Sequence, residues 1–110
     1  MGFFTIFVPD GLSESDYARA LKCSTGFIST RRRNHQDLLA AAGFSQVEEI
    51  DLTSQFLVTQ QGWHDGRERF HAELIEAEGE DAFAERQLDA EHMMEGIEAG
   101  LLRRALFLCT

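Results

Sequence analysis

The chain has 110 residues, of which 44 % are hydrophobic, enough to bury the core of a single domain over residues 1–110. Its formal net charge of −9 argues against a nucleic-acid-binding protein, because contacts to phosphates require positive charge. No apolar run approaches the ~20 residues of a membrane span, and no basic region precedes the first apolar stretch. We therefore expect a cytoplasmic protein without a membrane-spanning segment.

The first predicted element is a strand over residues 2–8, GFFTIFV, because aromatic and β-branched residues dominate it. A helix is predicted from an N-cap at Ser13 to residue 22. Its apolar face would consist of Tyr17, Ala20 and Leu21. Residues 23–34 mix small polar residues with three consecutive arginines and predict a loop.

The next predicted helix starts at Asn34 or His35 and ends before Gly43, a residue suited to a left-handed C-cap. Phe44 would pack back on that helix. Residues 46–53 alternate imperfectly between apolar and acidic side chains, which indicates a half-exposed edge strand.

Two long helices are predicted over residues 54–78 and 81–99, capped by Thr53 or Ser54 and by Asp81. Aromatic residues recur every seventh position in the first of them, at Phe56, Trp63 and Phe70. Glycines 62 and 66 disfavour a helix interior and predict a kink or break near Trp63. Glycines 79 and 100 would end the two helices.

The last predicted strand, residues 101–109, is almost continuously apolar, which is typical of a strand with a neighbour on both edges. The order of elements predicts an α+β fold in which a three-stranded mixed or antiparallel sheet carries packed helices. The two cysteines lack the spacing of a disulfide framework or a metal site and are expected to be reduced thiols.

Three segments together resemble the C-terminal part of class I S-adenosylmethionine-dependent methyltransferases, from their fifth strand onward. They are GFFTIFVP at Gly2–Pro9, GLSESD at Gly11–Asp16 and LLAAAGF at Leu38–Phe44. The closing LLRRALFL and the helical pair before it are similar to one bacterial branch of that family. The resemblance covers essentially the whole chain.

The family binds its cofactor with its N-terminal half, through a Gly-rich turn after the first strand and an acidic residue after the second. Neither feature has a counterpart in this sequence. The resemblance therefore implies no S-adenosylmethionine site on this chain alone. The chain would be half of a methyltransferase, a descendant of that half with a new use, or a fragment of a longer gene.

The resemblance further implies that strand 101–109 lies between the other two strands, antiparallel to both. Strand 2–8 would then have one bare hydrophobic edge, where the family's fourth strand pairs. Since such an edge is a template for another chain, we expect a homodimer formed through it. Edge pairing, strand exchange, coverage by a helix of the second copy and exchange of the helical pair are the alternatives.

The family's substrate side corresponds to the helices that here carry most of the aromatic residues. A small-molecule site is accordingly expected among five residues: Tyr17, Phe56, Trp63, Arg67 and Phe70. Trp63 is also well suited to a purely structural position in the core. We expect no catalytic, cofactor-binding or metal-ligating residue.

Two further polar patterns have a simple and a functional interpretation. His64, Glu68 and His71 share one helical face and could ligate a metal, although an exposed polar face with Glu68 paired to a neighbouring arginine is simpler. His35 beside Arg31–Arg33 could bind an anion or belong to a solvated basic loop.

These observations predict a non-catalytic, methyltransferase-like module with a small-molecule-binding or protein-interaction role. The alternative is the substrate-side half of a split methyltransferase whose cofactor-binding half is a separate chain. A functionless gene fragment, prone to aggregation through its bare first strand, is the third possibility.

Overall fold

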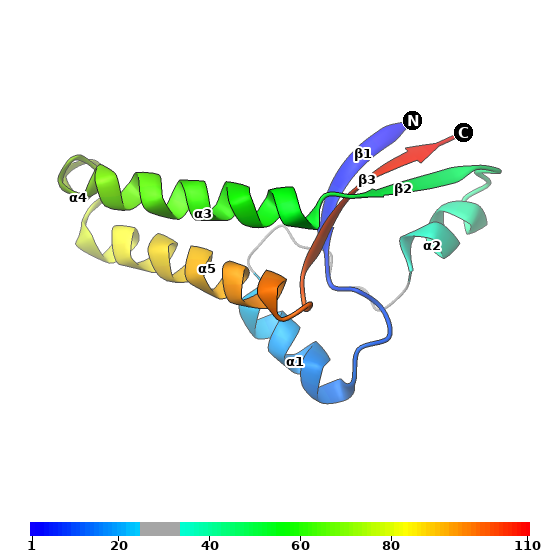
Figure 1. Ribbon diagram of the computed structural model, residues 1–110, viewed down its shortest axis with the longest axis horizontal. Helices are drawn as coiled ribbons and strands as arrows, with labels where there is room; N and C mark the ends of the chain where they lie inside the picture. Colours follow the sequence, from blue (N-terminus) through cyan, green and yellow to red (C-terminus); the bar gives the residue numbers. More distant parts are fainter. Residues whose placement is uncertain (25–33) are drawn as a thin grey trace.

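In the computed structural model of the chain, residues 1–24 and 34–110 are described, so the predicted loop over 23–34 lies almost entirely outside them. Within these ranges the chain is α+β, as predicted (Figure 1). The elements are, in order, β1 (Gly2–Phe7), α1 (Glu14–Cys23), α2 (His35–Ala41), β2 (Val47–Asp51), α3 (Thr53–Arg69), α4 (His71–Glu78), α5 (Glu80–Glu98) and β3 (Arg103–Cys109).

The sheet has the order β1-β3-β2, and β3 is antiparallel to both neighbours. This confirms the central position predicted for the last strand and selects the antiparallel alternative. Alternate side chains of β3 (Ala105, Phe107 and Cys109) are buried, as are Leu101 and Leu102 just before it, with Leu102 and Phe107 fully inaccessible to solvent. The apolar composition of the C-terminal segment therefore reflects burial in the middle of the sheet.

The hydrogen bonds of β3 alternate between its two neighbours. Met1 and Cys109 exchange two main-chain hydrogen bonds of 2.9 and 2.8 Å, and Gln46 and Thr110 exchange another two of 3.3 and 3.0 Å. Because hydrogen-bonded pairs recur at every second residue of an antiparallel ladder, odd-numbered residues of β3 bond to β1 and even-numbered residues bond to β2. The same alternation decides which groups of β1 and β2 point away from the sheet.

Helices cover both faces of the sheet. On one face α2 packs on a cluster formed by four buried residues, Phe7, Ala105, Phe107 and Cys109. On the other face α1, α3 and α5 surround a second cluster, whose buried residues are Val8, Ala20, Cys23, Phe56, Met93, Ile97, Leu101 and Leu102. The chain thus forms three layers, with the sheet in the middle (Figure 1).

The predicted glycine C-caps at residues 43 and 100 are confirmed. Both glycines have positive φ angles, 104° and 77°. After α2, Phe44 N–H bonds to the carbonyl of Leu39, and after α5, Leu101 N–H bonds to the carbonyl of Gly96. These are the bonds of a Schellman motif, which stops the helix and redirects the chain into the following strand.

The N-terminal caps were predicted less well. Ser13 accepts a hydrogen bond from Asp16 N–H at 3.1 Å, as expected for an N-cap. In contrast, α3 begins at Thr53 itself, after Leu52, and α5 begins after Gly79. The Thr53 hydroxyl bonds to Asp51 and to the β3 backbone at Arg104, so the sheet rather than a side-chain cap fixes the start of α3.

The helix predicted over 54–78 is divided at Phe70, whose ψ of 31° interrupts it, and not near Trp63. Gly62 and Gly66 are accommodated inside α3. The break allows Arg67 to form an ion pair with Glu78, eleven residues further on. In one straight helix these residues would lie about 16 Å apart along the axis.

α3, α4 and α5 extend well beyond the sheet (Figure 1). The radius of gyration is 16.2 Å, against about 13 Å for a compact domain of this length. We call residues 60–90, which form the far end of this helical hairpin, the distal arm. Among the described helices, none combines the length and the apolar character that crossing a membrane would require.

Candidate functional site

The three aromatic residues spaced by seven along the predicted helix have different surroundings. Phe56 is buried in the core beside the sheet, whereas Trp63 is 67 % exposed and Phe70 is 51 % exposed. The expectation that Trp63 is a core residue is therefore wrong. Only the first turns of α3 reach the sheet, and further out α5 covers just one side of the helix, which leaves the other side to solvent.

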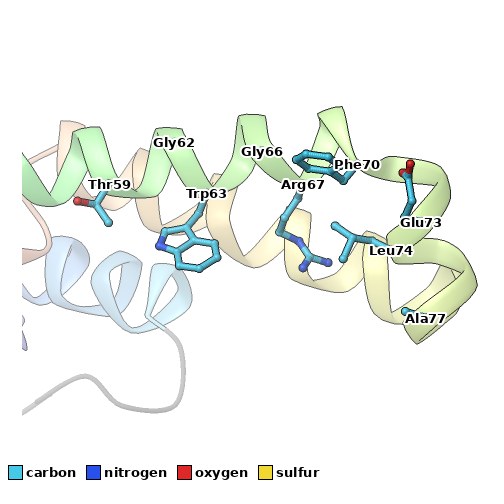
Figure 2. Close-up of a pocket in the computed structure, with 9 residues that line it drawn as sticks. All are labelled: Thr59, Gly62, Trp63, Gly66, Arg67, Phe70, Glu73, Leu74 and Ala77. Atoms are coloured by element: carbon cyan, nitrogen blue, oxygen red, sulfur yellow. The ribbon is translucent and has the colours of Figure 1, made fainter.

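The exposed side of α3 and α4 forms an open groove of about 810 Å³ (Figure 2). Trp63, Arg67 and Phe70, which the sequence suggested as ligand-binding residues, all line it. The complete lining is Thr59, Gly62, Trp63, Gly66, Arg67, Phe70, Glu73, Leu74 and Ala77. Nothing lies within 4 Å of a side chain built at either glycine, so the two glycines leave open space beside the indole ring.

Tyr17 and Phe56, the other two suggested residues, lie elsewhere. Tyr17 on α1 packs against the core cluster to which Phe56 belongs, on the face of the sheet that α1, α3 and α5 cover. The sequence interpretation missed the small and polar members of the groove. Their spacing could have identified them, because each lining residue from Thr59 to Ala77 has another one three or four positions away, as on one face of a helix.

Arg67 is held in place from behind the groove. Its guanidinium forms an ion pair with Glu78, donates a 3.1 Å hydrogen bond to the Gln87 side chain and lies 5.2 Å from the centre of the Phe83 ring. Glu78 also pairs with Arg86. Because Glu78 is shared by two guanidiniums, these contacts fix Arg67 behind the groove without cancelling its charge completely.

Gln87 connects this ion pair to α3. It is only 5 % exposed, and its amide donates to the carbonyl of His64 at 3.1 Å and to the Glu68 carboxylate at 2.9 Å. The same side chain accepts the bond from Arg67. One amide therefore joins the backbone and two side chains of α3 to α5, and it fixes how the two helices of the distal arm face each other.

Of the three residues His64, Glu68 and His71, the last two approach each other, with His71 Nδ1 3.9 Å from a Glu68 carboxylate oxygen, and His64 has a different partner. His64 Nε2 lies 3.1 Å from a carboxylate oxygen of Glu91, and the His71 ring packs 4.6 Å from that of Phe83. Among the described residues there is no group of three potential ligands placed to hold a metal ion. The predicted arginine partner of Glu68 is not Arg67, which pairs with Glu78 instead.

His35 lies against the sheet. Its ring is 4.9 Å from that of Phe7 and 5.2 Å from that of Phe107, centre to centre. This position makes His35 part of the packing between α2 and the sheet. Arg31–Arg33, the proposed basic neighbours, lie outside the described residues.

The Cys23 thiol and the Asp51 carboxyl have shifted pKa values, and both belong to the sheet end of the molecule. Burial raises the pKa of the Cys23 thiol, and the nearby Glu95 adds to the effect. Hydrogen bonding to Thr53 lowers the pKa of Asp51, and Arg103, 3.1 Å away, lowers it further. Cys23 and Cys109 are both buried, free thiols, as the sequence suggested.

S-adenosylmethionine, the cofactor of the family that the sequence resembles, does not fit the described residues. It requires a Gly-rich turn between a strand and the exposed N-terminus of a helix. Between β1 and α1 the described residues offer one glycine, Gly11, and the following helix N-terminus is already capped by Ser13. Gly43 and Gly100 follow helices instead, so no chemical step is assigned to this cofactor.

No protein-family model matches the chain, and no curated protein matches it significantly. What this chain does is therefore inferred from the geometry of its described residues.

Proposed function

We propose that the chain is a non-catalytic, methyltransferase-like module of the cytoplasm, and that it binds a small, largely apolar, partly aromatic molecule in the groove of the distal arm. One observation carries this proposal: Trp63 and Phe70 remain more than half exposed on the same apolar groove. Contiguous exposed aromatic surface is costly in water and commonly marks a binding surface.

The chemistry of the lining supports an uncharged ligand. Leu74 and Ala77 continue the apolar surface beyond Phe70, and Glu73 is the carboxylate among the lining residues. Arg67, the cation of the lining, is engaged by Glu78 and has the opposite sign to Glu73. An indole face and a phenyl ring on either side of a fixed guanidinium offer stacking surfaces for a flat ring.

The groove has its own reporter, because Trp63 is the one tryptophan of the chain. Titration with toluene as a probe, which does not absorb at the red edge of the indole absorption, should shift or quench its fluorescence in a saturable manner. Phe70→Ser should weaken binding roughly tenfold by removing one stacking surface. The matched control is Val58→Ser, which changes an exposed side chain of α3 that does not line the groove.

The two variants together decide the outcome. Saturable binding that Phe70→Ser weakens and Val58→Ser leaves unchanged would support the groove as the binding site. A fluorescence response that is linear in probe concentration, or equal losses in both variants, would contradict it.

The second candidate is the substrate-side half of a split methyltransferase. The strand order β1-β3-β2, with β3 antiparallel to both, is the order that the resemblance implies, and it favours this alternative. The outer edge of β1 would then pair with the fourth strand of a separate cofactor-binding chain.

Calorimetric titration with S-adenosylmethionine and S-adenosylhomocysteine separates the two candidates. The non-catalytic module predicts no binding by the folded chain. Binding at micromolar strength, about −8 kcal/mol, would contradict that prediction. Binding only after addition of a cofactor-binding partner chain would support the split enzyme, and aggregation that grows with concentration would favour a functionless fragment.

A further inference from the structure

The two edges of the sheet differ in their protection. On β2, VEEID, three of the five side chains are carboxylates, namely Glu48, Glu49 and Asp51. On β1, GFFTIF, no side chain is charged. Natural sheets commonly place charges on edge strands because bare edges pair with other chains. The side chains of β2 therefore protect its edge by their charge, and those of β1 do not.

The register of the sheet shows which main-chain groups of β1 do not bond to β3; one of them, the Ile6 carbonyl, accepts a 3.5 Å hydrogen bond from the Thr5 hydroxyl. Met1 and Cys109 form a hydrogen-bonded pair, so the residues of β1 that bond to β3 are Phe3, Thr5 and Phe7. The N–H and C=O groups of Gly2, Phe4 and Ile6 consequently point away from β3. The main-chain hydrogen bonds of the described residues supply no partner strand on that side.

We infer that this edge pairs with the same edge of a second copy of the chain, antiparallel, around a two-fold axis at Phe4. In this register Phe4 faces Phe4 of the second copy, and Gly2 faces Ile6 in both directions. Every outward N–H and C=O of the three residues then obtains a partner, because the set is symmetric about its middle member. This self-complementarity favours a second copy over an unrelated strand.

The side chains fit the same arrangement. Phe4 is 58 % exposed, although its ring is contacted by Arg104 on β3. Directly opposed residues of an antiparallel pair lie about 5.5 Å apart between Cα atoms, so the two Phe4 rings would cover each other. Gly2 adds no side chain of its own against Ile6 of the second copy, and the Leu108 side chain lies beside it, 3.0 Å from the position of a Cβ atom.

The pairing would also stop at two copies. It would join the sheets into six strands whose outer edges are both β2 strands. The carboxylates of β2 disfavour any further addition. A closed two-fold dimer, rather than a fibre, is the expected assembly.

Sedimentation equilibrium of the intact protein over roughly 1 to 500 µM tests the inference. The wild-type chain should approach the mass of a dimer. Phe4→Pro removes an outward N–H without touching the hydrogen bonds to β3, so it should weaken the dimer about thirtyfold, for one lost bond per copy, and leave the chain folded. Thr5→Pro is the matched control, because it removes an N–H that bonds to β3 and should unfold the sheet.

Phe4→Lys provides a second route that does not depend on tolerance of proline, since it places two positive charges on the axis and should also give monomers. Phe4→Cys should form an intermolecular disulfide under mild oxidation, whereas Val58→Cys on α3 should not. A wild-type chain that stays monomeric at the highest concentration, or a dimer that survives both Phe4→Pro and Phe4→Lys, would overturn the inference. Cross-linking through Val58→Cys and not through Phe4→Cys would overturn it as well.

Discussion

The sheet end of the molecule and the distal arm are stabilised by different kinds of contact. Around β3, Leu102, Phe107 and Cys109 are almost completely buried between helices on two sides. Within residues 60–90, Phe83 and Gln87 are the buried residues, and an ion pair with an amide network joins the helices. A sheet covered on both faces buries its apolar residues, whereas two helices side by side leave one face of each exposed.

The contacts that supply most of the stability therefore differ from those that orient the helices of the distal arm. Apolar burial near the sheet supplies most of the free energy of folding. The polar contacts of the distal arm contribute less to it, but their directional bonds fix the orientation of α3 relative to α5. The groove with Trp63 is therefore positioned by a part of the molecule that adds little to the total stability.

The largest expected effect is a loss of core packing. Phe107→Ala should reduce the free energy of unfolding by about 3–5 kcal/mol, because it leaves a cavity between the sheet and α2. Val58→Ala, at a residue that is 73 % exposed, should change it by less than about 0.5 kcal/mol. Urea unfolding of both variants measures the contrast, and similar losses would contradict the assignment of the core.

A smaller loss of stability is expected from a substitution in the distal arm. Gln87→Ala should reduce the free energy of unfolding by about 2 kcal/mol, because the His64 carbonyl and the Arg67 guanidinium each lose one hydrogen bond. Leu88→Ala, at the adjacent half-exposed residue, should cost well under about 1 kcal/mol. The emission of Trp63 should change in Gln87→Ala and stay constant in Leu88→Ala. An unchanged emission in both would mean that the amide does not orient the helices.

Two glycine substitutions should change the free energy of unfolding in opposite directions. A Cβ atom at Gly96 would lie 2.9 Å from both the Cys23 Cβ and the Leu102 Cδ1, so Gly96→Ala should destabilise by about 1 kcal/mol after the gain in helix propensity. Gly66→Ala on α3 meets nothing within 4 Å and should stabilise by up to about 1 kcal/mol. Thermal unfolding gives both values, and equal signs would contradict the contrast in packing.

The smallest expected effect is a dependence of the folding stability on pH. The pKa of Asp51 is lower in the folded chain than its unfolded value of about 3.9, so its contribution is present above that value and disappears as the pH falls through the folded pKa. Asp51 is 54 % exposed, which keeps the contribution well under about 1 kcal/mol. Asp51→Asn should thus be less stable than wild type at pH 7 and equal to it in acid.

Thr53→Val supplies the control for that measurement. The Thr53 hydroxyl is the main cause of the lowered pKa of Asp51, so in a Thr53→Val background the Asp51→Asn difference should shrink. A difference of the same size in both backgrounds would assign the effect to the Thr53 main-chain N–H and Arg103 instead.

Local signals in the sequence were sufficient for most of the fold. The apolar run at the C-terminus predicted a central strand, and glycines 43 and 100 ended their helices where expected, because positive φ angles strongly favour glycine. Three of the suggested ligand-binding residues, Trp63, Arg67 and Phe70, do lie on one groove. Helical spacing alone brings Trp63 and Arg67 to the same face of α3, and Phe70, at the C-cap of this helix, continues that face.

The sequence by itself thus determined the element types, the order of the strands through their composition, and the aromatic face of α3. Only the tertiary structure decided that Trp63 is exposed, that the long helix breaks at Phe70, and that Gln87 joins α3 to α5. Periodicity records which residues share a face, but it does not record what covers that face. How far a helix extends beyond the sheet depends on contacts between residues distant in the chain, such as Arg67 with Glu78 and Gln87.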